Sequence, residues 1–185
     1  MKRILLSAAV VLVAVATPYA HADAQRRIIP FVGVGLATGT GDLSEGTDSG
    51  WSAFAGIDLP VGLTPGLTLG LTGSYTRVPY QGSFDEATNI PALFGELGYV
   101  IGAKSSSIVK PYVRAGAGVQ VRRYDPGTTG YQKQSDGGLA FSVGGGVRFL
   151  VSSTALFVGA RLVGDGDAGF VAFHGGVAFP GRAAK

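Results

Sequence analysis

The sequence contains no cysteine, and only 15% of its residues are charged. Without cysteine the fold has no disulfide bond, so its stability has to come from burial and backbone pairing. No run of basic residues follows the first residues of the chain, so we expect no nucleic-acid partner. The mean hydropathy of +0.31 is nevertheless high for a secreted domain.

The N-terminus has the three parts of a secretory signal peptide. Lys2 and Arg3 precede an apolar run over residues 4–16, and small residues follow it. The pattern of small residues allows cleavage after Ala22 or Ala24. We therefore expect residues 1–24 to be a signal peptide and residues 25–185 to be the exported domain. The apolar run is too short for a transmembrane helix, which needs about 20 residues.

Alternation with a period of two runs through the rest of the chain. In FVGVGLATG, for example, Val32, Val34 and Leu36 share one face of an extended strand, while Gly33 and Gly35 share the other. The pattern recurs at 28–39, 50–59, 66–78, 89–103, 108–124, 137–151, 154–164 and 168–179. Most of these segments reach the length of about 9–11 residues that a tilted strand needs to cross a bilayer.

The connections between these segments alternate in length. TGDLSEGTDSG, YQGSFDEATN and DPGTTGYQKQSDG are long and polar, whereas PVGLTPG, AKSSS and SS are short. Short periplasmic turns and longer external loops are typical of outer-membrane barrels. The sequence therefore predicts an all-β fold, a single eight-stranded antiparallel up-and-down transmembrane barrel.

Two opposite arrangements of the strand faces are possible. A soluble lipocalin-like ligand carrier would turn the apolar face inward, whereas a membrane barrel turns it toward lipid. Eight strands leave an interior just wide enough for side chains to fill. The large apolar side chains are too many for that space, while the face rich in glycine and alanine fits it. The pattern favours the membrane barrel and keeps the soluble carrier as the alternative.

A few titratable residues lie at alternate positions whose side chains should point into the barrel. We expect them to form a polar network that plugs the bore, because an isolated charge in a confined interior costs several kcal/mol. The members of this expected network are Glu96, Arg114, Arg148, Arg161 and His174. If the chain turns near residues 104–107, paired positions add up to about 211, and Glu96 and Arg114 lie diagonally across neighbouring strands.

Two further arginines, Arg77 and Arg123, have the lipid-facing parity at the external ends of their strands. Long cationic side chains there can extend to headgroup level, where the phosphates of lipopolysaccharide are possible partners. The stretch VRAGAGVQVRR around Arg123 contains Gly-x-Gly, but no helix start follows it. It is therefore interpreted as a strand and not as a nucleotide-binding loop.

His174 is the one histidine of the expected mature chain, because His21 lies in the expected signal peptide. Lipid A deacylase barrels carry His-x-Ser on one strand, whereas Gly176 stands two residues after His174 here. We expect no enzyme activity, with a lipid-A-modifying barrel enzyme as an alternative. One mature histidine and no cysteine also argue against a transition-metal site, and no cofactor is expected.

The last strand, VAFHGGVAF, alternates Val171, Phe173, Val177 and Phe179. It resembles the C-terminal signal of outer-membrane barrels, although PGRAAK follows Phe179. With this strand, the mature chain resembles the small eight-stranded outer-membrane barrels, the family of the OmpA transmembrane domain, OmpX and the opacity proteins. This resemblance implies location in the outer membrane of a Gram-negative-type bacterium and delivery by the barrel assembly machinery. It also implies a structural or surface-interaction protein, which we expect to be a monomer and whose loop partner the sequence does not name.

Overall fold

The computed structural model describes residues 28–62, 64–82, 86–127, 132, 134–166 and 168–179. Its strands are β1 (Ile29–Gly41), β2 (Gly50–Pro60), β3 (Leu67–Pro79), β4 (Ala87–Val100), β5 (Val109–Asp125), β6 (Gln134–Val151), β7 (Thr154–Gly164) and β8 (Ala168–Ala178). One 3-10 turn, η2 (Asp42–Ser44), follows β1. Among the described residues, no helix has the length and apolar character to cross a membrane. The expected signal peptide, with both cleavage positions, lies outside the described residues.

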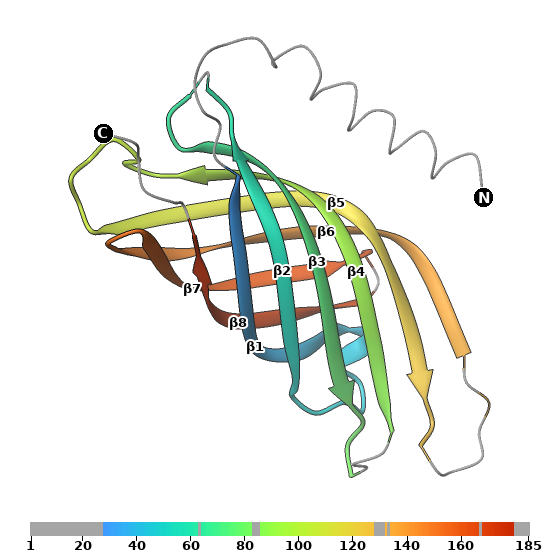
Figure 1. Ribbon diagram of the computed structural model, residues 1–185. Coiled ribbons are helices and arrows are strands. Elements are labelled where there is room, and N and C mark those ends of the chain that lie inside the picture. The colour runs from blue at the N-terminus through green and yellow to red at the C-terminus, as the bar shows by residue number, and fades with distance from the viewer. Residues whose placement is uncertain are drawn as a thin grey trace, which may run out of the picture.

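The eight strands form one closed antiparallel barrel in which each strand pairs with its sequence neighbours and β8 closes onto β1 (Figure 1). A path that starts at Ile29 and steps from each residue to its paired residue on the next strand returns to β1 at Gly39 after one turn around the barrel. The strands are therefore staggered by ten residues over one turn. Such a stagger makes the strands tilt relative to the barrel axis. The predicted all-β barrel is confirmed, and its strand limits differ from the expected ones by at most three residues.

The apolar faces of the strands point outward. Val34, Leu36 and Phe141 expose 64%, 67% and 63% of their surface, although each lies in the middle of a paired strand. Ala37, which follows Leu36, and Ala140, which precedes Phe141, are fully buried. This is the arrangement of a membrane barrel. A soluble carrier would bury the valines and leucines instead, so that alternative is wrong.

The interior is filled by larger side chains than the sequence led us to expect. Among the described residues, the aromatic side chains packed in the interior clusters are those of Phe31, Phe54, Phe94, Tyr112, Phe157 and Phe170. Glycines at the paired positions of neighbouring strands leave space for these rings. A Cβ atom on Gly33 would lie 2.4 Å from the Phe54 ring, and one on Gly176 would lie 2.4 Å from the Phe157 ring. The lumen is therefore not purely polar, because apolar clusters lie on both sides of the ion pairs, among other buried polar side chains such as Gln120 and Lys110.

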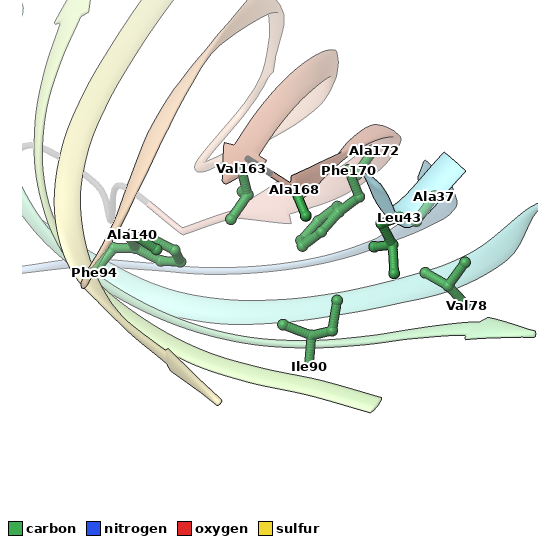
Figure 2. Close-up of a cluster of buried hydrophobic side chains, with 10 residues drawn as sticks. All are labelled: Ala37, Leu43, Val78, Ile90, Phe94, Ala140, Val163, Ala168, Phe170 and Ala172. Carbon is green, nitrogen blue, oxygen red and sulfur yellow. The ribbon is translucent and has the colours of Figure 1, made fainter. Parts of the chain in front are cut away.

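The external end of the bore is closed by an apolar cluster (Figure 2). Leu43 on η2 turns inward and packs with Phe170, Val78 and Ile90. Backbone hydrogen bonds join the β1–β2 loop to the β3–β4 end, from Asp48 N to Pro79 O at 2.8 Å and from Gln81 N to Gly46 O at 2.8 Å. The first loop thus covers the mouth of the barrel.

A charged side chain introduced on the outer wall should distinguish this barrel from one whose apolar side chains point inward. Leu93 lies in the middle of β4 and is half exposed on the outer wall. Leu93→Arg should lower the free energy of unfolding in lipid vesicles by about 2–4 kcal/mol, the cost of a cationic side chain near the bilayer midplane. Urea titration of the folded barrel measures it. Gln81→Arg, on the exposed external turn, is the matched control and should change the stability little.

Candidate functional site

Glu96 is the centre of the interior network. Its side chain is 1% exposed and accepts hydrogen bonds from Arg161 at 2.7 Å and Arg114 at 3.0 Å. The hydroxyl groups of Ser142 and Thr72 donate to the same carboxylate at 2.9 Å and 2.5 Å. These four donors come from β3, β5, β6 and β7. One carboxylate on β4 therefore ties together five of the eight strands.

Asp58 on β2 is the second buried carboxylate, and the sequence analysis missed it. Arg114 donates to its two oxygens at 2.7 Å and 2.9 Å, and Arg148 donates at 3.2 Å. Asp58 is an even number of residues from Ser52 on the same strand, so both side chains point inward. This spacing could have identified Asp58 as an interior residue. The position of Asp58 beside Pro60, at the end of an expected strand, obscured this spacing.

Each arginine of the network also lies over an aromatic ring. The guanidinium carbon of Arg114 is 4.7 Å from the centre of the Phe31 ring, that of Arg161 is 4.7 Å from the Phe94 ring, and that of Arg148 is 5.0 Å from the Tyr112 ring. A cation over a ring face is stabilised by the ring quadrupole. The rings thus supplement the two carboxylates, which are fewer than the three cations.

His174 lies apart from these ion pairs, although the sequence placed it among them. Its Nε2 is 3.3 Å from the hydroxyl oxygen of Tyr112. The rings of Phe54 and Phe157 approach its imidazole edge-on, with centroids 5.0 Å and 6.0 Å away. His174 therefore belongs to the aromatic layer on the periplasmic side of the network.

The β4–β5 register explains one of the glycines in VRAGAGVQVRR. Glu96 pairs with Gly116, and Gly98 pairs with Arg114, so paired positions add up to 212 and not to about 211. The sum has to be even for this pair of strands, because directly paired residues share a face and the inward residues of both β4 and β5 have even numbers. A Cβ atom on Gly116 would lie 2.7 Å from Cγ of Glu96. The glycine makes room for the Glu96 side chain.

A separate polar cluster lies at the external mouth. Arg122 on β5 forms an ion pair with Asp165 in the β7–β8 turn and donates to the Ala168 carbonyl at 3.0 Å. The Ala168 N–H donates to Asp165 Oδ1 at 3.3 Å. Partial burial raises the pKa of Asp165, but these hydrogen bonds and the charge of Arg122 outweigh it and bring the pKa below 3.8.

On the outer wall, Arg77, Asn89 and Arg123 form one row across three strands. Asn89 pairs directly with Arg77 on one side and with Arg123 on the other. Neither arginine forms an ion pair within the described part of the chain. Beside them is a groove of about 410 Å³ whose lining includes Tyr75, Asn89 and Arg123.

An aromatic pair stands at one end of this row. Trp51 pairs directly with Arg77, and its ring centre is 5.4 Å from that of Tyr75. The Tyr75 hydroxyl donates to Asn89 Oδ1 at 2.7 Å. Tryptophan and tyrosine at such a level mark the membrane interface of barrels.

The three residues of the expected assembly signal lie at the β1–β8 closure. Phe173 and Phe179 are exposed on the outer wall, and Val177 is half-buried. The Phe179 N–H donates to the Pro30 carbonyl at 2.9 Å, so pairing continues to the end of β8.

Among the described residues, no group of three or more histidine, aspartate or glutamate side chains is placed to bind a metal ion.

Comparison with known families agrees with this architecture. Residues 6–162 match the model of the outer membrane protein beta-barrel domain. The chain belongs to this family. Its location is accordingly the outer membrane of Gram-negative bacteria. No curated protein sequence matches the chain significantly.

Solved structures of small outer-membrane barrels have the same fold. Neisserial surface protein A (NspA) superposes with a TM-score of 0.65 at 17% identity, over 83% of this chain and 96% of that one. Ail, the attachment invasion locus protein of Yersinia pestis, gives 0.53 at 13%, over 82% and 97%. The N-terminal β-barrel domain of Pseudomonas aeruginosa OprF gives 0.52 at 18%, over 83% and 97%. At these identities the likeness establishes the fold alone.

Loss of the Glu96 charge should destabilise the barrel. Glu96→Gln keeps the shape of the side chain but leaves Arg114 and Arg161 without their shared anion, and an unpaired buried charge costs about 3–5 kcal/mol. The free energy of unfolding, measured by urea titration in detergent micelles, should fall by that order. Glu45→Gln makes the same change on the exposed first loop and should have little effect. Equal stability of the two variants would contradict a central role for Glu96.

Acid should loosen the β7–β8 turn. Because the folded pKa of Asp165 lies below its ordinary value of 3.8, its contribution to stability is present above that value and is lost as the pH falls through the folded pKa. Hydrogen exchange of the Ala168 amide should therefore accelerate, beyond its intrinsic pH dependence, at pH values well below 3.8. Asp165→Asn should remove this dependence, and an unchanged profile in that variant would refute the assignment.

Proposed function

We propose that this protein acts at the cell surface as a closed outer-membrane barrel, presenting loops and an outer wall and transporting nothing through its lumen. The observation that supports this most strongly is the filled bore. The cluster around Phe170 and Leu43 closes the external end, the Glu96 and Asp58 ion pairs cross the middle, and the ring of Phe157 fills the periplasmic side. A barrel filled in this way offers solutes no continuous water path.

The absence of transport is tested by electrical recording. Purified protein reconstituted into a planar lipid bilayer should give no stepwise conductance, because the interior side chains leave no aqueous path. An open porin reconstituted in the same way is the positive control, and detergent alone is the negative one. Stable, ohmic channel openings that depend on the protein would contradict the proposed closed lumen.

The outer wall is proposed to bind lipopolysaccharide. Arg77 and Arg123 flank Asn89 at the level where the aromatic pair marks the membrane interface. Directly paired residues have Cβ atoms about 4.5–5.5 Å apart, so the two guanidinium groups can reach one phosphorylated headgroup from both sides. Arginine forms charge-assisted, bidentate hydrogen bonds to phosphate. The groove beside Asn89 can take part of the attached sugar.

The double variant Arg77→Gln, Arg123→Gln tests this binding site. Hydrogen bonds to charged groups contribute about 1.5–3 kcal/mol each, so the affinity for lipopolysaccharide in detergent should fall at least about tenfold. Native mass spectrometry or surface plasmon resonance measures it. Lys104→Gln, on the exposed β4–β5 turn, is the matched control. Dephosphorylated lipopolysaccharide should not distinguish the double variant from the wild type, and equal affinities for the intact ligand would contradict the site.

A catalytic role is not favoured by the surroundings of His174. Its Nε2 faces the Tyr112 hydroxyl, and its ring is enclosed by Phe54 and Phe157. Nucleophilic catalysis needs a nucleophile held within reach of its base and open to substrate. We infer a non-enzymatic monomer, assembled through the outward β8 residues Phe173, Val177 and Phe179. The external loops remain the proposed contact surface for a partner that the chain does not identify.

A further inference from the structure

A small cavity lies inside the barrel where the ion network meets the aromatic layer. Its volume is about 20 Å³, and Arg114, Arg148, Arg161 and His174 contribute to its lining together with aromatic rings. A cavity needs about 10–15 Å³ by this measure to hold one water molecule. The space therefore suits a single small particle and is too small for a phosphate, a sulfate or any part of a lipid.

The charges around this cavity do not cancel. Within the described part of the chain, Arg114, Arg148 and Arg161 face only two carboxylates, those of Asp58 and Glu96. The other described cations near the bore are engaged elsewhere. Lys110 donates to backbone carbonyls of the β4–β5 turn at 2.7 Å and 3.1 Å, and Arg122 pairs with Asp165 at the external mouth. With His174 neutral, the network carries one excess positive charge, which costs several kcal/mol in a buried site.

Arg148 is the residue with the weakest ionic compensation. Its contact with Asp58 is 3.2 Å long, and Arg114 already occupies both oxygens of that carboxylate at 2.7 Å and 2.9 Å. Its guanidinium group lies over the Tyr112 ring. The excess charge is therefore assigned to the Arg148 side of the cavity.

Buried polar atoms without a hydrogen-bond partner belong to the residues that line this cavity. Within the described residues, five buried side-chain nitrogen or oxygen atoms lack a hydrogen-bond partner, and four of them belong to residues that line the cavity. These four are Nε of Arg114, Arg148 and Arg161 and Nδ1 of His174. An arginine Nε always carries a hydrogen, so it can only donate. The ligand that satisfies the three arginine groups must be an acceptor.

We propose that the cavity binds one small monovalent anion of the size of chloride. The anion neutralises the excess positive charge and accepts hydrogen bonds from the arginine Nε–H groups. Aromatic ring edges, which carry partial positive charge, complete such a site, and Phe31, Phe54 and Phe157 line it. A water molecule can fill the space and accept hydrogen bonds, but it leaves the excess charge uncompensated. The site lies inside the barrel and is independent of the loops and of the outer wall.

Bromide provides the direct test, because its anomalous scattering distinguishes it from water. The mature protein is refolded in detergent with sodium gluconate, transferred to sodium bromide at equal ionic strength and crystallised. We expect one anomalous peak between Arg148, Arg161 and His174. Density without an anomalous signal, or bromide bound only on the surface, overturns the proposal.

Thermal stability provides the second readout. A ligand that binds only the folded state raises its stability as the ligand concentration rises, so the melting temperature should increase with chloride or bromide and saturate, relative to gluconate at equal ionic strength. Arg148→Gln removes the excess charge and should abolish this dependence, whereas Lys104→Gln on the exposed turn should retain it. If Arg148→Gln does not fold, the wild-type bromide peak decides. Equal melting temperatures of the wild-type protein in bromide and gluconate overturn the proposal.

Discussion

A strand that crosses the hydrocarbon of a membrane has to pair on both edges, because lipid offers no hydrogen-bond partner to the peptide groups. The pairing of β8 with β1 meets this requirement for the whole chain. Closure with eight strands then fixes the width of the bore to about the size of the side chains that fill it. The contents of the interior follow from that narrow width, since rings such as those of Phe54 and Phe157 need a glycine at the paired position of a neighbouring strand.

The interior has three layers, ordered along the barrel axis. The apolar cluster that includes Leu43 and Phe170 lies toward the loops, and the rings around Phe157 lie toward the short turns. The carboxylates of Glu96 and Asp58 hold three arginines between them. Charges in this position are shielded from water on both sides. Their pairing is therefore costly to break, and it connects strands that are not neighbours in the sheet.

The side chains of the outer wall depend on their level in the membrane, because the surroundings change from hydrocarbon to a polar medium. The hydrocarbon zone accepts only apolar side chains such as Val34 and Leu36, which are exposed without penalty there. At the external edge, Trp51 and Tyr75 mark the change to a polar medium, and Arg77 and Arg123 lie beside them. We propose that the arginines at this level bind phosphates, whereas the interior arginines pair with carboxylates. The same residue type thus serves two purposes, according to its parity along the strand.

The sequence alone determined the strands and which residues share a face, because a period of two depends only on local chain geometry. The number and size of the apolar side chains then favoured the outward direction for their face, because the bore of eight strands is too narrow for them. The sequence also identified Glu96 and Arg114 as inward neighbours. The tertiary structure decided which side chains meet across the bore. Asp58 contacts Arg148 ninety residues away, and His174 turns to Tyr112 and not to Glu96. Such contacts depend on the stagger and tilt of the closed barrel, which no single strand encodes, so they could not be derived from strand patterns one at a time.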